Sequence, residues 1–268
     1  MGVIVTVSGT GSEENNGAVI TNEETKQKNG MGGAYADFAI LDPVLTRTVP
    51  QKQLISGAFD TLSHAMETYF GTPRESFVPN EIAEAIMRNV IKNSRVIVKN
   101  PDDKFARSEL KWDSTIAENG ILKIGKVTDF QAHMLEHQLG TYTNCNHGMG
   151  LAAIHPSLYH HIYQGAVNQF ARFAVNVWNV PDEGQGEEAL ALAGIDALEA
   201  FIKEIGMPTS LSEMEITDED LLRKVADSTI ITKGCKKQLT ADEIFEVLKD
   251  AMYRLTFSFM AKVRHYRI

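Results

Sequence analysis

Hydrophobic and polar positions follow two different periods along this chain. Near the N-terminus, short apolar runs are separated by turns rich in glycine, asparagine and charged residues, which is typical of β-strands. The runs that predict strands are Val3–Val7, Ala18–Thr21 and Phe38–Leu41. Asp42 and Pro43 close this region, because the residue before a proline is disfavoured in the helical conformation.

From residue 50 onward the apolar positions repeat at about 3.6 residues, which predicts amphipathic helices. One stripe runs over Leu54–Tyr69. Further helices are predicted over residues 82–97, 104–119, 127–139, 167–177, 186–205, 218–227 and 241–253. Thr217 and Thr240 are expected to cap two of these helices, because an acidic residue follows each of them three positions later.

The predicted fold class is therefore mainly α. A small strand-rich piece over residues 1–49 precedes an all-helical domain over residues 50–268. The 268 residues are enough to bury a large core without disulfides. The content of 43% hydrophobic and 23% charged residues is that of an ordinary globular chain.

Charge and hydropathy argue against several classes of partner. The formal net charge is −9 and the Lys and Arg residues form no basic stripe, so we expect no nucleic-acid partner. No apolar run approaches the roughly 18 residues of a membrane span, and no signal-peptide pattern opens the chain, so we expect a cytoplasmic protein without a membrane partner. Cys145 and Cys235 are expected to be free thiols.

Four of the eight histidines have a spacing that suggests a metal site. Asp60 and His64 lie four residues apart on one predicted helix, so they point from the same face. His133 and His137 repeat this spacing on another helix, and His147 follows after a glycine-containing turn. A carboxylate and imidazoles from different helices can hold a divalent metal, and these ligand types suit Zn²⁺ or Fe²⁺.

A plainer interpretation stays open for each pair. An Asp and a His four residues apart on a helix commonly form a surface pair that contributes roughly a few tenths of a kcal/mol. The apolar neighbours favour the metal, because Asp60 and His64 lie among Phe59 and Leu62, and a buried polar group needs a partner. The remaining four histidines, at 155, 160, 161 and 265, are predicted to be surface or capping residues.

The turn Gly9–Ser12 after the first predicted strand resembles a phosphate-binding loop only weakly. Glu14 stands where the dinucleotide-binding fingerprint has its third glycine, and the Gly-Lys-Ser/Thr ending of a P-loop is missing. We interpret it as a turn of small residues that lets another group approach the backbone.

Taken together, these segments resemble the iron-containing (group III) alcohol dehydrogenase family, and most closely its butanol dehydrogenase branch. The matching stretches are Thr10–Glu13, Ala18–Thr25, Ala36–Pro43, Gly57–His64, Asn119–Gly120, His133–His137 and His147–Ala152. The resemblance extends over nearly the whole chain, to about Met252. It implies a helical metal-binding domain like that of dehydroquinate synthase, preceded by the remnant of an α/β dinucleotide-binding domain.

The resemblance also implies roles for individual residues. The family's metal ligands fall on Asp60, His64, His133 and His147. The positions that line the nicotinamide cofactor, NAD or NADP, fall on Thr6, Thr10 and Ser12. His137 falls on a histidine that lies near the substrate and relays a proton, a role suited to an ordinary pKa near 6.5. The implied metal is Fe²⁺, with Zn²⁺ as the alternative.

The implied reaction is hydride transfer between NAD(P) and a small, butanol-like alcohol or aldehyde, with the metal as Lewis acid. The family's cofactor-holding α/β domain would precede Met1, so we expect a truncated member, a fragment or one partner of a split protein, with feeble activity of its own. Two alternatives stay open: a catalytically inactive metal-binding module, and a helical metal-dependent hydrolase. The hydrolase is the weaker one, because the chain has no His-Asp dipeptide. A homodimer is compatible with the sequence.

Overall fold

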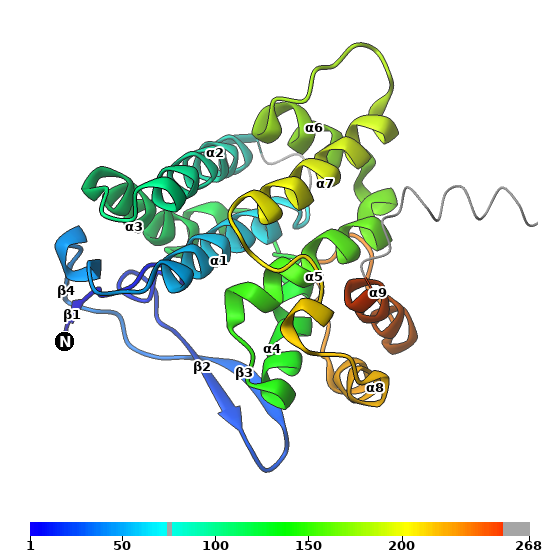
Figure 1. The fold of residues 1–268 in the computed structure, drawn as a ribbon, viewed down its shortest axis with the longest axis horizontal. Helices are drawn as coiled ribbons and strands as arrows, with labels where there is room; N and C mark the ends of the chain where they lie inside the picture. The colour runs from blue at the N-terminus through cyan, green and yellow to red at the C-terminus, as the bar shows by residue number, and fades with distance from the viewer. Residues whose placement is uncertain (74–76, 254–268) are drawn as a thin grey trace, which may run out of the picture.

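The structure is a computed structural model that describes residues 1–73 and 77–253 (Figure 1). The strands are β1 Gly2–Ile4, β2 Gly17–Asn22, β3 Gln27–Gly32 and β4 Phe38–Ile40. The α-helices are α1 Gln51–Tyr69, α2 Phe77–Lys99, α3 Lys104–Glu118, α4 Gln131–Thr143, α5 His147–Ile162, α6 Val167–Trp178, α7 Glu187–Glu204, α8 Glu219–Ser228 and α9 Ala241–Tyr253. Short 3-10 helices cover Pro43–Thr46, Ile121–Lys123, Tyr163–Ala166 and Ser212–Met214. The fold is mainly α with a small strand-rich piece, as predicted.

The strands form two small sheets. β1 pairs with β4 in parallel, and β2 pairs with β3 as an antiparallel hairpin. Within the described residues β1 and β4 each have a single strand partner, so each leaves one edge unpaired. The sequence pattern assigned Gln27–Gly32 to a turn, and that was wrong. Nearly all side chains of this strand are exposed, so no alternation of apolar and polar residues marks it.

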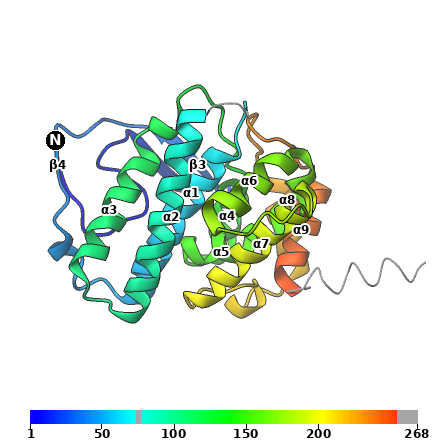
Figure 2. The same cartoon turned by 90° about the horizontal axis from the view of Figure 1, so that it is seen from above.

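Helix α1 forms the centre of the helical part. Helices α2, α3 and α5 pack against it, with α3 and β4 at one end of the molecule and α8 and α9 at the other (Figures 1 and 2). Almost every residue from Leu54 to Tyr69 is buried, including polar ones such as Asp60 and His64. Because neighbours cover α1 on several sides, its polar residues lie inside the protein and need partners there.

Helix α5 is the main element that the sequence pattern did not predict. It contains Pro156, which normally breaks a helix, and its residues from Gly150 to Tyr159 are all buried. A helix that is apolar all round has no polar stripe to reveal its period. Asn146 caps its first turn by accepting a hydrogen bond from the Met149 amide.

Two predicted helix starts differ from the observed ones. α8 begins after Asp218, whose carboxylate accepts hydrogen bonds from the first turn, so the cap predicted at Thr217 was wrong. α4 begins at Gln131 and not at Val127, because Val127 forms a β-bridge with Thr72. The cap predicted at Thr240 is confirmed, since its hydroxyl and the Glu243 carboxylate each accept a hydrogen bond from the other residue's amide.

Among the described residues, no helix combines the length and the apolar character needed to cross a membrane. The change from strands to helices falls near residue 50, but the division into domains at that point stays a prediction. One of the four histidines predicted to be surface or capping residues, His265, lies outside the described residues.

Candidate metal centre

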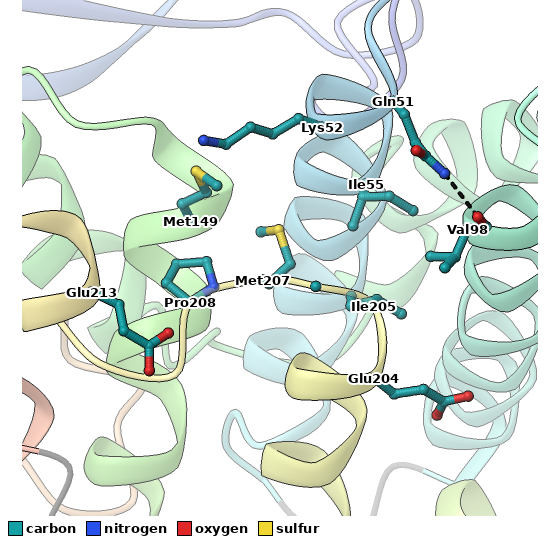
Figure 3. A pocket seen from close by; sticks show the side chains of 11 residues that line it. Gln51, Lys52, Ile55, Val98, Met149, Glu204, Ile205, Met207, Pro208 and Glu213 are labelled. Atoms are coloured by element: carbon teal, nitrogen blue, oxygen red, sulfur yellow. Dashed lines mark hydrogen bonds between the residues drawn. The ribbon is translucent and has the colours of Figure 1, made fainter.

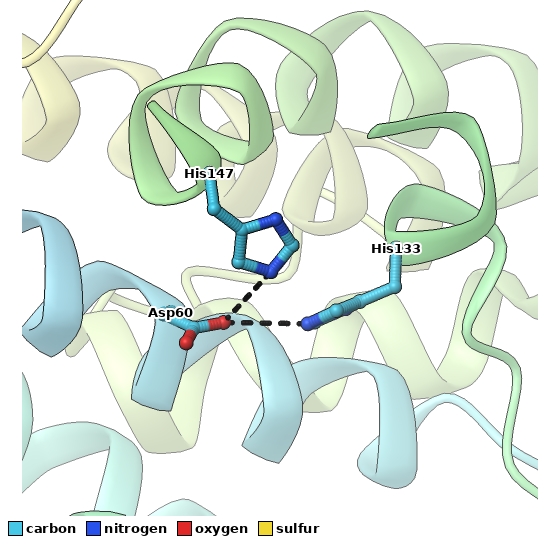
Figure 4. A group of neighbouring side chains, drawn as sticks. All are labelled: Asp60, His133 and His147. Carbon is cyan, nitrogen blue, oxygen red and sulfur yellow. Dashed lines mark hydrogen bonds and ion pairs between the residues drawn. The ribbon is translucent and has the colours of Figure 1, made fainter. Parts of the chain in front are cut away.

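Three helices bring four of the predicted site residues to one point. α1 supplies Asp60 and His64, α4 supplies His133, and His147 is the first residue of α5. The Nε2 atoms of His64, His133 and His147 lie 3.4, 3.3 and 3.4 Å from the same oxygen, Asp60 Oδ1. Figure 4 shows the rings of His133 and His147 converging on this oxygen of Asp60 from two different helices.

This donor set fits a divalent metal ion. Asp60, His133 and His147 each offer one ligand atom within 4.8 Å of the other two. A Zn²⁺ ion takes imidazole nitrogen and carboxylate oxygen at about 2.0–2.2 Å, so small movements of these side chains would complete a coordination sphere. The same nitrogen and oxygen donors suit Fe²⁺.

The electrostatics of the cluster also favour a cation. Burial alone would raise the pKa of Asp60, but the neighbouring His64, His133 and His147 outweigh it and hold the pKa well below its usual value. Burial would lower the pKa of His133, yet Glu67 and Asp60 raise it to about 10. The cluster therefore stabilises positive charge at its centre, which is what a bound metal supplies.

Three glutamates, two of them buried and Glu118 nearly so, face the outer side of the same imidazoles, and no pattern in the sequence predicted them. Glu67 contacts His133 Nδ1, Glu136 contacts His147 Nδ1, and Glu118 Oε1 lies 2.9 Å from His64 Nδ1. Glu67 and Glu118 hold pKa values below normal, because the neighbouring histidines outweigh the effect of burial. No local pattern marks these residues, since glutamate is common on helices.

His137 lies beside the cluster but does not belong to the group around Asp60. Its ring centre is 6.0 Å from that of His133 and 5.6 Å from that of His147. Within the described residues its buried Nδ1 has no hydrogen-bond partner. Burial and the nearby positive groups lower its pKa to about 2, below the ordinary value to which a proton relay is suited, and this favours a neutral imidazole.

A cavity of about 700 Å³ opens over the ligand cluster. The hairpin β2–β3 forms one wall, and Thr10 and Ser12 line it near Asp60 and the histidines. Thr6 is exposed and is not among the lining residues, so the structure brings two of the three predicted cofactor residues to the cavity. Phe130 and Met134 supply apolar lining beside the ligands.

A second cavity, of about 610 Å³, lies between the start of α1 and the end of α7 (Figure 3). Its lining includes Lys52, Met149 and Met207 and contains no histidine or cysteine. Gln51 closes one side by donating a hydrogen bond to the Val98 carbonyl oxygen at 2.9 Å. The ligand cluster is therefore the stronger candidate site.

The prediction for the other histidines holds only in part. His155 is fully buried, and its Nε2 lies 2.7 Å from Ser63 Oγ, so the surface assignment was wrong for this residue. The signal was not local, because Ser63 is 92 residues away in the sequence. His160 and His161 lie in the last turn of α5, where His161 pairs with Asp250.

The sequence matches the model of the Fe-containing alcohol dehydrogenase family, C-terminal part, over residues 54–252. The chain belongs to this family. NADH-dependent butanol dehydrogenase B from Clostridium acetobutylicum is 33% identical over 257 residues, which are 93% of this chain and 65% of that protein. NADPH-dependent aldehyde reductase YqhD from Escherichia coli is 31% identical over 247 residues, or 90% of this chain and 63% of that protein.

Solved structures of this alcohol dehydrogenase family agree. The crystal structure of NADH-dependent butanol dehydrogenase A from Thermotoga maritima superposes with a TM-score of 0.86 at 33% identity. The match covers 94% of this chain and 65% of that one. The family, its butanol dehydrogenase branch and the mainly α fold are thus confirmed, and the chain spans about 65% of the length of such relatives.

Proposed function

We propose that this chain supplies the metal-binding half of an NAD(P)-dependent dehydrogenase for small alcohols and aldehydes. The observation that carries the proposal is the convergence of three imidazole Nε2 atoms on Asp60 Oδ1 at a cavity wall. Relatives named as butanol dehydrogenases and as an aldehyde reductase support the substrate class. Fe²⁺ is the preferred metal in this proposal and Zn²⁺ the alternative.

The ligand cluster would hold the metal and place an alcohol oxygen in the cavity. The residues that would bind the ion are Asp60, His64, His133 and His147. When bound, the metal supplies a Lewis acid that lowers the cost of forming the alkoxide. The His147 side chain is 31% exposed, against 3% for His133, so the open side of the cluster lies toward His147.

The remaining lining residues would handle the proton and exclude water. His137 lines the same cavity, and its buried Nδ1 has no hydrogen-bond partner among the described residues. As a neutral imidazole of low pKa, it would relay the proton that the alcohol loses by accepting it at one ring nitrogen while the other nitrogen releases its own proton, without holding the proton as imidazolium. Phe130 and Met134 keep that side of the cavity apolar, which strengthens electrostatic interactions inside it. Thr10 and Ser12 would lie along the nicotinamide, the hydride carrier of the reaction.

Metal removal and refilling test the proposal. We expect a chelated chain to take up one equivalent of Fe²⁺ or Zn²⁺, measured as metal per chain by mass spectrometry. His64→Ala should lose most of this binding, because it removes a ligand atom. His160→Gln, on α5 but outside the cluster, is the matched control and should bind as the parent does. A parent chain that retains no metal would contradict the proposal.

Turnover distinguishes the dehydrogenase from an inactive metal-binding module. We would join the chain to the α/β domain of a butanol dehydrogenase relative and follow NADH oxidation with butanal. Activity should disappear on chelation and return on refilling. A joined protein that binds metal and cofactor but shows no turnover would favour the inactive module.

A further inference from the structure

We propose that Glu67, Glu118 and Glu136 are positioning residues that set the orientation and the metal affinity of the three ligand histidines. Each glutamate comes from a different helix, α1, α3 or α4, and each faces the Nδ1 atom of a different imidazole. This inference rests on the proposed metal site and deepens it.

The pair of Glu67 and His133 is the most firmly held. Glu67 Oε2 contacts His133 Nδ1, while Glu67 Oε1 accepts a hydrogen bond of 2.6 Å from the Ala132 amide. The glutamate side chain is 2% exposed and the histidine side chain 3% exposed. A carboxylate fixed by the backbone of α4 thus fixes the ring of the ligand on the same helix.

The other two pairs are built differently. Glu136, fully buried on α4, contacts His147 Nδ1 at the start of α5, so this pair joins two helices. Glu118 is the last residue of α3, and its Oε1 lies 2.9 Å from His64 Nδ1 without an aligned hydrogen bond. Orientation therefore depends most on Glu67 and Glu136, whereas Glu118 contributes mainly its charge.

The chemistry of imidazole explains what these contacts accomplish. A neutral histidine carries one ring proton, and a carboxylate can only accept it, so a carboxylate at Nδ1 leaves the lone pair on Nε2. All three Nε2 atoms point to Asp60 Oδ1, where the metal would lie. Outer carboxylates of this kind orient a ligand histidine and increase its basicity toward the metal.

Charge balance gives the glutamates a second effect. Asp60 and the three glutamates place four carboxylates around the site. Lys123 Nζ lies 3.3 Å from Glu118, and Lys28 Nζ of the hairpin lies 3.8 Å from Glu136. A divalent ion together with the two ammonium groups would neutralise the four carboxylates. Removing one carboxylate should therefore weaken the attraction for the ion even where the ring keeps its orientation.

Glutamine substitutions separate these effects from a purely structural role. A glutamine oxygen can still accept the Nδ1 proton, but the charge is lost. We expect Glu67→Gln, Glu118→Gln and Glu136→Gln each to weaken Zn²⁺ binding about 10- to 100-fold, measured by competition with a chromophoric chelator. Alanine at positions 67 and 136 should weaken it further than glutamine. The visible absorption of the Co²⁺-loaded protein should shift in the same variants.

Glu84→Gln is the matched control. Glu84 is also buried, on α2, but it pairs with Tyr69 and Arg172 and has no hydrogen bond or ion pair to a histidine within residues 1–73 and 77–253. Its variant should bind Zn²⁺ as tightly as the parent and leave the Co²⁺ spectrum unchanged. Thermal melting of each metal-free variant shows whether it folds. If a variant of the more buried Glu67 or Glu136 fails to fold, the Zn²⁺ affinity of Glu118→Gln is compared with that of the parent instead, because Glu118 is the most exposed of the three glutamates.

The outcomes separate this inference from the proposed function. A parent chain that binds no metal would overturn both. A parent that binds one equivalent, with glutamine variants that bind equally well, would overturn the inference alone. The inference is also overturned if Zn²⁺ affinity decreases in proportion to the melting temperature in every variant, including the control Glu84→Gln.

Discussion

Asp113 is a buried carboxyl group whose ionisation should oppose folding. It lies on α3, where Asn89 Nδ2 donates hydrogen bonds to both of its oxygens at 3.0 and 3.1 Å. Burial raises its pKa to about 7 against the lowering effect of Asn89, and the charge of Glu109 adds to the increase. The folded protein therefore holds a proton that the unfolded chain, with a pKa near 3.8, has already released.

The sign of the pH effect follows from this difference. Between about pH 4 and 7 the folded state binds more protons at Asp113, so the free energy of unfolding falls as pH rises, by up to about 1.4 kcal/mol per pH unit. Asp113→Asn removes the ionisable group and with it this decrease in the free energy of unfolding. We expect the variant to gain stability over the parent from pH 5 to pH 8, as measured by urea unfolding. Asp182→Asn, an exposed control, should show no such trend, and a pH-independent difference for Asp113→Asn would contradict the prediction.

At the same scale, sequence spacing identified the residues around Asp60 but not the groups behind them. Asp60 and His64 share a helix face, so their spacing carries information. Glu67 and His133 are 66 residues apart, and their contact exists only because α1 and α4 pack together. A tertiary contact of this kind leaves no local pattern in a single sequence.

At the scale of elements, the close approach of α5 to α1 positions His147. Gly148 follows His147, and a Cβ atom at Gly148 would lie 2.3 Å from the Ser56 carbonyl oxygen and 2.5 Å from its hydroxyl. Such distances cannot be accommodated without moving one helix. The absence of a side chain at this position thus lets the first turn of α5 reach the ligand cluster.

Gly148→Ala should therefore destabilise the protein and weaken its metal site together. Overpacking typically costs about 1–3 kcal/mol, and the displaced turn carries His147. We expect a lower melting temperature and weaker Zn²⁺ binding. Gly165→Ala is the control, because its Cβ would meet no atom closer than 3.5 Å. Parent-like metal affinity in a folded Gly148→Ala chain would show that the turn tolerates the shift.

The elements themselves were predictable where one face is apolar and the other polar. α2 and α9 follow this rule, and the 3.6-residue period found them. α1 is buried on most sides, but its polar residues still alternate with apolar ones at the helical period, so it was found as well. The buried part of α5 consists mostly of apolar residues on every side, and the side chains of β3 are nearly all exposed, so neither shows a period. These two exceptions both contribute to the candidate site, since α5 carries His147 and β3 lines the cavity.

At the scale of the whole molecule, the described residues bring the four predicted metal ligands together, but only two of the three predicted cofactor residues reach the cavity. Thr10 and Ser12 lie at the cavity, yet the Gly9–Ser12 turn lacks the fingerprint that holds a pyrophosphate. The relatives it matches are longer, since the chain spans about 65% of their length. Apolar side chains such as Ile4 and Phe38 are exposed on the small parallel sheet, where a further domain could pack.

We therefore expect the chain of 268 residues to bind metal but to oxidise NADH with butanal feebly or not at all. Holding the reactants in the right geometry can supply roughly 7–11 kcal/mol of a barrier, and a dinucleotide without its anchor at a helix N-terminus is poorly held. Placing the α/β domain of a butanol dehydrogenase relative before Met1 should raise the rate strongly. In that joined protein His137→Ala should slow turnover while the metal content stays unchanged, because His137 lies beside the ligands and not among them. Rapid NADH oxidation by residues 1–268 alone, measured under the same conditions, would show that this chain already holds the cofactor in place.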